Sequence, residues 1–420
     1  MATFFIPSRC SVNLPFHSYT YFTTLFYALL FFFNPTISIV VSFLDLVFCN
    51  KPSKRKYYTF YLLLAAWLGV LNMTKQLFSD QIYYAKIFVS VDRTNFFSAV
   101  FNYRGTGALS LKEFFFNFYS VVLNYFTNAN SQAYFFILTV NIYFLHFLSI
   151  HKVYSACNRV KLEILCSVIL MAFFFPFFIQ SVHAVRQILA TSFLVYAIAY
   201  QSVNGRTHWP FLLIAFFIHN TTIFFIVCSL LPGLYKIHSF KQILLYLSLF
   251  VLFILSYVQL GTILSTLNLG AISAVGERMM TAELSDENEL FSIRNTLIYS
   301  IPVMLCSVLI IKRDYMTQHL SSLGTFAYLS MLTLLFVFSM TNAPTLQFRY
   351  MFYIYSFFPF IVLPIADSAN ISSNIYTLLV TLFFAFRFFL VDVDWDLFAS
   401  SSDFILNTFI DFLITSYYSI

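Results

Sequence analysis

Long apolar runs follow one another along almost the whole sequence, and they constrain the fold more than any other feature. A helix needs about 20 mostly apolar residues to cross a bilayer. Runs near that length predict an all-α polytopic membrane protein with about ten to twelve transmembrane helices, forming one integral membrane domain over residues 1–420. The candidate spans are Tyr21–Val47, Tyr57–Leu71, Gln132–Ile150, Leu162–Gln180, Gln187–Gln201, Trp209–Leu231, Ile243–Leu260, Thr296–Ile311, Leu323–Met340, Tyr350–Ile365, Tyr376–Val391 and a weaker stretch, Phe404–Ile420.

The composition excludes the main classes of soluble protein. Hydrophobic residues make up 60% of the 420 residues and charged residues only 10%, whereas soluble domains have about 45–50% and about 25%. The formal charge of +6 is scattered along the chain, so it forms no basic face of the kind that binds nucleic acid. Met1–Phe16 lacks the pattern of a cleavable signal peptide, so we expect the spans themselves to retain the protein in the membrane.

Lysines and arginines give the spans an orientation, because short loops rich in these residues stay in the cytoplasm. This rule puts the N-terminus outside, together with two long connections, Asn72–Ser131 and Gly261–Asn295. Inside the first run, Asn34-Pro35 predicts a kinked helix rather than the end of a span. The cytoplasmic residues would be Lys51, Lys54, Arg55, Lys56, Lys152, Arg159, Lys161, Arg206, Lys312 and Arg313.

The run Trp209–Leu231 conflicts with this rule, because Arg206 before it and Lys236 and Lys241 after it all favour the cytoplasm. A re-entrant hairpin would satisfy both flanks, since irregular backbone is tolerated at membrane depth when it is buried in protein or lines water. The alternative is one kinked span with its later basic residues outside, drawn there by an anionic ligand. The sequence leaves both open.

Arg186 is the first polar residue whose position is costly, because an arginine at bilayer depth costs about 2.5–3.5 kcal/mol on insertion scales. In one continuous helix, His183, Arg186, Gln187 and Ala190 would share a face. This grouping favours a ligand-facing role for Arg186. The alternative is an arginine that reaches back to the membrane interface.

Two further polar residues interrupt apolar runs. His219 stands with Asn220, Thr221 and Thr222 in the middle of its run, which indicates a polar pocket, although a lone histidine in an apolar helix more often packs. Arg349 begins an apolar run next to Tyr350, so it is either a ligand contact or an interfacial anchor.

The two long connections carry further candidates. Asp80 and Glu113 in the first connection would serve as general bases or orient an acceptor sugar, unless they are solvated loop charges. The segment Phe114–Phe126 predicts an interfacial helix on the outer leaflet. Arg278 in the second connection is either a ligand contact or solvated surface.

Signals for metal binding are weak. The six cysteines show no CxxC pair and no spacing typical of a metal site. Asp392, Asp394 and Asp396 alternate around a tryptophan, a spacing that would hold a divalent ion through oxygens or form a flexible acidic loop. We therefore predict no metal site and no cofactor.

The ordered motifs resemble those of EpsG-like, Wzy-type polysaccharide polymerases. Asp80-x-x-x-Tyr84 and Lys112-Glu113 resemble the early loop of that family, apart from Phe114, where the family often has proline. Arg186-Gln187-x-Leu189-Ala190, followed by Phe217-Ile218-His219-Asn220-Thr221, resembles its central pattern. Arg349-Tyr350 resembles its late arginine. The resemblance covers roughly residues 71–360, most of the chain.

The resemblance implies a multi-pass enzyme of the bacterial inner membrane, similar in architecture to GT-C glycosyltransferases. It would join undecaprenyl-diphosphate-linked oligosaccharide repeat units at the periplasmic face, without a metal and with inversion, and a chain-length regulator is a further candidate partner. Two alternatives stay open: an O-antigen ligase, and a flippase for lipid-linked oligosaccharide, although no internal repeat of the kind common in transporters is visible. The implied roles are catalysis for His219, with Asp80 in reserve; diphosphate binding for Arg186, Gln187, Arg349 and Arg278; and acceptor or sugar binding for Glu113, Tyr84, His183 and Thr221.

Overall fold

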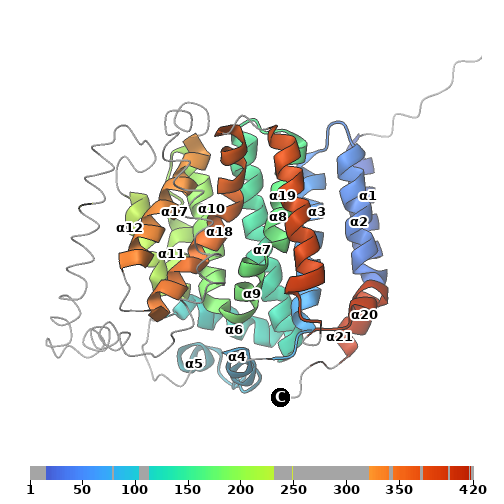
Figure 1. Ribbon diagram of the computed structural model, residues 1–420. Coiled ribbons are helices and arrows are strands. Elements are labelled where there is room, and N and C mark those ends of the chain that lie inside the picture. The colour runs from blue at the N-terminus through green and yellow to red at the C-terminus, as the bar shows by residue number, and fades with distance from the viewer. Residues whose placement is uncertain are drawn as a thin grey trace, which may run out of the picture.

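The computed structural model describes residues 16–77, 80–103, 113–230, 248, 321–339, 344–368, 372–395, 398–415 and 417. Every regular element in these ranges is helical, and the longer helices stand side by side in a bundle (Figure 1). The elements are α1 (Phe16–Phe33), α2 (Pro35–Phe48), α3 (Lys54–Met73), α4 (Asp80–Val89), α5 (Phe96–Asn102), α6 (Phe114–Thr127), α7 (Ser131–Ala156), α8 (Lys161–Phe173), α9 (Phe175–His183), α10 (Val185–Asn204), α11 (Trp209–Ile218), η1 (Asn220–Thr222), α12 (Ile223–Leu230), α17 (Ser321–Ser339), α18 (Pro344–Ser368), α19 (Ser373–Arg387), η4 (Phe388–Asp392), α20 (Ser401–Leu406) and α21 (Phe409–Ile414).

Within these ranges, two helices are long and apolar enough to cross a membrane: residues Ser131–Ala156 and Asn374–Asp392. A third candidate arises if α8 and α9, which meet at an angle of 51°, form one broken span. The predicted all-helical class is confirmed for the described residues, and these apolar helices are compatible with a membrane protein. The predicted number of spans stays a prediction.

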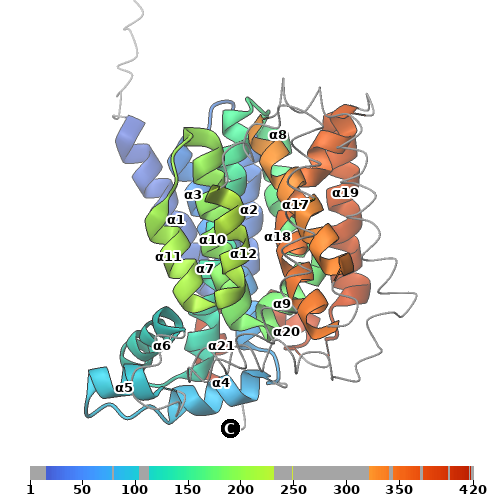
Figure 2. The ribbon, with the colours of Figure 1, turned by 90° about the vertical axis from the view of Figure 1, so that its left-hand side faces the viewer.

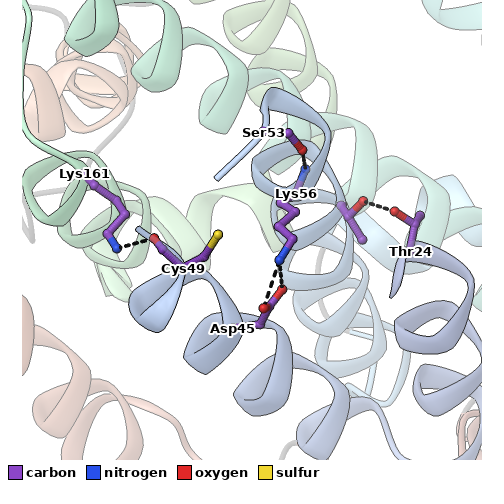
Figure 3. A network of polar contacts seen from close by, with 7 residues as sticks. Thr24, Asp45, Cys49, Ser53, Lys56 and Lys161 are labelled. Carbon is purple, nitrogen blue, oxygen red and sulfur yellow. Dashed lines mark hydrogen bonds and ion pairs between the residues drawn. The ribbon is translucent and has the colours of Figure 1, made fainter. Parts of the chain in front are cut away.

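Lys56 and Lys161 both contact the last turns of α2 (Figure 3), and we call this end of the bundle the basic end. Lys161 at the start of α8 donates to the backbone carbonyls of Val47 (2.6 Å) and Cys49 (3.0 Å), which end α2. Lys56 in the first turn of α3 pairs with Asp45 at 2.8 Å. These contacts fix the α2–α3 turn against α8. The opposite end, crossed by α4, α5 and α6, is called the far end (Figure 2).

The predicted kink at Asn34-Pro35 is wrong, because the chain turns back there. The Ser38 hydroxyl donates to the Tyr27 carbonyl (2.8 Å), so α1 and α2 lie against each other as a hairpin (Figure 1). Asn34 adopts an extended backbone before the proline, as such residues prefer, and its side chain caps α2. The Arg55 guanidinium lies 3.5 Å from the centre of the Tyr21 ring. The helix α1 therefore begins at the same end of the bundle as the start of α3, and the predicted side of the membrane stays a prediction.

The segment around His219 forms the hairpin that the basic flanks favoured. His208, just before α11, packs its ring 4.7 Å from that of Tyr200 near the end of α10. The Gln201 amide, one residue further, donates to the Ser229 carbonyl at the end of α12 (2.9 Å). The helix α11 therefore starts, and α12 ends, beside the same turn of α10 (Figure 2). The alternative of a single kinked span is wrong.

The closing apolar stretch, predicted over Phe404–Ile420, does not form a span in its described part. It contributes to α20 and α21, of six residues each, which at 1.5 Å per residue are about 9 Å long. The Thr408 side chain caps α21 by accepting from the Asp411 amide (3.1 Å), so a new helix starts instead of the first continuing.

The first long connection, predicted over Asn72–Ser131, contains the helices α4, α5 and α6, which lie across the far end (Figures 1 and 2). The helix predicted over Phe114–Phe126 is confirmed as α6, with Asn117 and Asn124 buried on its protein side. Its place on a leaflet stays a prediction. The second connection, Gly261–Asn295, lies outside the described residues.

Candidate functional site

Arg186 lies in the first turn of α10, just after a break in the helix. Ala184 leaves the helical conformation (φ −92°, ψ 48°), so α9 ends at His183 and α10 begins at Val185. The prediction that His183 shares a helical face with Arg186 and Gln187 is therefore wrong, because helical spacing does not continue across the break, whereas Arg186, Gln187 and Ala190 all lie in α10. The same break lets Arg186 point toward the helices of the first connection.

Arg186, Glu113 and Tyr84, predicted separately, come together in the structure. The Arg186 guanidinium forms an ion pair with the Glu113 carboxylate, whose side chain is 6% exposed against 19% for the arginine. It also lies over the Tyr84 ring, 5.2 Å from its centre. A guanidinium held by a carboxylate on one side and an aromatic face on another has a fixed direction.

Glu113 keeps its ion pair with Arg186 although its backbone conformation is one that glutamate does not favour. It precedes α6 with a left-handed backbone (φ 62°) and makes no side-chain hydrogen bond that would cap the helix. Such a conformation costs an ordinary residue about 1–2 kcal/mol. Strain of this kind persists where surrounding contacts determine the conformation, and it concentrates at functional sites.

Gln187 joins α10 to α18. Its side-chain amide donates to the backbone carbonyl of Arg349. The Arg349 side chain is exposed and makes no ion pair within the described part of the chain. Gln187 and Arg349 were both predicted to bind the diphosphate, but the Gln187 side chain is hydrogen-bonded to the Arg349 backbone.

His219 forms the turn between the two hairpin arms with an extended backbone (φ −152°, ψ 121°). Its Nδ1 lies 2.8 Å from the Thr221 hydroxyl, which lies 2.6 Å from the Tyr353 hydroxyl of α18. The Tyr350 hydroxyl also reaches the Thr221 carbonyl at 3.5 Å. Tyr353 was not predicted, and its only sequence signal is its spacing of one helical turn from Arg349.

Two routes of direct contact connect Arg186 with His219. On one route, Glu113 precedes α6, in which Phe115 packs 6.1 Å from Phe217, two residues before His219. On the other route, the Gln187–Arg349 contact lies one turn of α18 from the Tyr353–Thr221–His219 chain. The arginine and the histidine therefore belong to one region, at the far-end side of α10 and α18.

A buried lysine, Lys75, adds a cation that the sequence reasoning missed. It follows α3, is 1% exposed, and lies 3.1 Å from His183 Nε2 and 3.5 Å from Gln81 Oε1. It forms no ion pair among the described residues. Burial lowers the pKa of Lys75 to about 8. Gln81, which Lys75 contacts, and Tyr84, which Arg186 overlies, are three residues apart on α4 and so share a face. Lys75 and Arg186 therefore contact positions about one turn apart on α4.

The other predicted residues are either not described or are paired elsewhere. Arg278 lies outside the described residues, and Asp80 is the first residue of α4 with its side chain also outside them. Asp392 pairs with Arg387 (2.9 Å). Within the ranges that are described, no three His, Cys, Asp or Glu side chains are grouped so that they would hold a metal ion.

No protein-family model matches this chain, and no curated protein or solved structure matches it. The chemistry of the site rests on the contacts described above. They provide an oriented guanidinium, a buried ammonium and an imidazole whose Nδ1 lies within hydrogen-bonding distance of the Thr221 hydroxyl. Such a set would bind an anion and accept a proton nearby.

Proposed function

We propose that this protein is a polysaccharide polymerase, a polytopic, GT-C-like glycosyltransferase of the bacterial inner membrane. It transfers lipid-diphosphate-linked oligosaccharide repeat units onto one another. The observation that carries the proposal is the contact between the Arg186 and His219 regions through α6 and α18. Their place away from the basic end supports an extracytoplasmic reaction, because basic loops stay in the cytoplasm.

The balance of charge supports binding of the diphosphate. Arg186 is already offset by Glu113, whereas Lys75 and Arg349 have no ion-pair partner among the described residues. The described side chains of the region therefore carry net positive charge. As the sugar is transferred, the leaving diphosphate gains negative charge, which pre-oriented cations stabilise.

His219 is the proposed general base. The acceptor hydroxyl attacks the anomeric carbon of the donor, the bond from that carbon to the diphosphate oxygen breaks, and the hydroxyl proton passes to His219 Nε2. For this the Nδ1–H must donate to Thr221 Oγ1 and the Thr221 hydroxyl to Tyr353, which leaves Nε2 with its lone pair. Direct displacement inverts the configuration at the anomeric carbon.

The contacts revise four proposed roles. Glu113 and Tyr84 orient Arg186 instead of binding the acceptor, and Gln187 positions the backbone of Arg349 instead of binding the diphosphate. Thr221 selects the tautomer of His219. Residues that act in this way are positioning residues, and their loss is expected to slow the reaction without abolishing it.

The test is complementation of a host strain from which the gene has been deleted. The deletion is expected to reduce surface glycan to single repeat units, and Arg186→Ala is expected not to restore polymer. Arg206→Ala is the control, because Arg206 is exposed near the end of α10 that packs against His208. Full-length polymer from Arg186→Ala contradicts the proposal. Polymer that accumulates without reaching its final acceptor indicates a ligase, and repeat units retained inside the cell indicate a flippase.

A further inference from the structure

A cleft lies between α4 and α5, beside the candidate site but separate from its cations. Its volume is about 540 Å³, within the usual range of about 300–1,000 Å³ for small-molecule sites. Side chains with hydrogen-bonding groups make up most of its lining: Tyr83, Ser90, Asp92, Ser98, Asn102 and Tyr103.

The lining favours a neutral, hydroxyl-rich ligand. None of the described residues that line the cleft is a lysine or arginine, so the described lining offers an anion no counter-charge. Tyr83 is 47% exposed, which leaves an aromatic surface for a sugar ring to pack on. Hydroxyl and amide groups both donate and accept, as sugar hydroxyls require.

Asp92 supplies the charged acceptor. One of its oxygens accepts from the Thr94 amide at 2.9 Å. The Thr94 amide and hydroxyl hold the pKa of Asp92 below its ordinary value, so the group is ionised at neutral pH. A carboxylate makes hydrogen bonds to hydroxyl groups that are roughly twice as strong as neutral ones.

The cleft adjoins the reaction region through aromatic contacts. Tyr83 precedes Tyr84, which underlies Arg186, and their rings lie 5.8 Å apart. On the other wall, Tyr103 packs 6.5 Å from Phe116, which packs 5.7 Å from Tyr84. A chain bound in the cleft would therefore extend toward the arginine.

We infer that the α4–α5 cleft binds a saccharide segment of the acceptor chain, with Tyr83 as the stacking surface and Asp92 as the hydroxyl acceptor. This inference rests on the proposed function, because the acceptor of a polysaccharide polymerase is a glycan. It is distinct from the residues that bind the diphosphate. Saccharide binding at the cleft holds the growing chain between transfers, so its loss is expected to shorten the product.

The experiment measures binding of a probe without lipid or phosphate. The purified full-length protein in detergent is titrated with short oligosaccharides released by mild acid from the host's own surface glycan. We expect Tyr83→Ala and Asp92→Asn each to weaken binding about tenfold, the effect of losing about 1.4 kcal/mol, and Tyr83→Phe to retain it. Tyr58→Ala, an exposed tyrosine on α3 beside His151, is the control.

The same variants separate this inference from the proposed function. Binding that survives Arg186→Ala but falls in Tyr83→Ala supports the subsite, even where no transfer activity is found. Equal binding by Tyr83→Ala, Asp92→Asn and Tyr58→Ala overturns it, and so does an unchanged product length in the two cleft variants. Either of these results leaves a polymerase with normal chemistry standing.

Discussion

Replacing Gly69 by alanine tests the packing that holds the bundle together near the site. Gly69 lies in α3 where that helix packs against α7, and an added Cβ would lie 2.9 Å from Phe136 Cδ2 and 3.1 Å from the Phe136 carbonyl oxygen. The phenyl ring would have to move, and the backbone oxygen would have to move with α7. Overpacking of this kind costs about 1–3 kcal/mol.

Gly324 provides a matched control, because it also lies within a helix, α17, but an added Cβ would meet nothing within 4 Å. Glycine to alanine gains about 0.8–1.0 kcal/mol of helix propensity at either position. The difference between the two substitutions therefore isolates the contact with Phe136, and we expect it to be about 1–3 kcal/mol.

The assay is thermal unfolding of the detergent-solubilised protein, followed by intrinsic fluorescence in one detergent for all variants. We expect Gly324→Ala to unfold at or above the midpoint of the wild type and Gly69→Ala to unfold below it. A midpoint for Gly69→Ala equal to that of Gly324→Ala would refute the close approach of α3 and α7.

Three further predictions concern the site. Glu113→Gln leaves Arg186 without its carboxylate, so the free energy of unfolding should fall by about 1–3 kcal/mol, measured by thermal unfolding. Thr221→Val keeps the side-chain shape but removes the partner of His219, so kcat should fall about 10–100-fold with KM unchanged in an in vitro polymerisation assay. For Lys75, whose pKa of about 8 lies below its ordinary value of 10.5, the unfolded state binds the proton between these pH values while the folded state does not. Stability should therefore rise with pH across that window, and Lys75→Met should remove this rise when the unfolding midpoints of the two proteins are compared.

Much of the helical class follows from the sequence, but the reversals of direction do not. Apolar runs predict where helices lie, because each run must bury or shield its backbone in the same way. At Asn34-Pro35 and at His219, the local residues permit either a kink or a reversal. The choice depends on contacts with distant elements, such as that between Ser229 and Gln201.

The site was predictable in part. Motifs pointed to Arg186, Glu113 and Tyr84, but no spacing along the chain indicates that the carboxylate would pair with this guanidinium, which lies 73 positions away. Lys75 was missed because it ends an apolar run and resembles an interfacial anchor. Its contact with His183 joins residues 108 positions apart, which a single sequence cannot reveal.

The turn at His219 shows how structure and chemistry depend on the same groups. A polar turn deep in an apolar bundle requires partners for its backbone, and Thr222 supplies one by donating its hydroxyl to the His219 carbonyl at 2.9 Å. In the tautomer with the proton on Nε2, the imidazole supplies another, because the Thr221 amide donates to its Nδ1 at 3.4 Å. Proton transfer uses the other tautomer, in which the Nδ1–H donates to the Thr221 hydroxyl oxygen. A truncation to alanine would therefore remove a cap as well as a base. Asparagine caps helix starts through its side-chain oxygen and does not accept a proton at neutral pH. His219→Asn is thus the substitution that separates the two roles: folding should persist while transfer is lost.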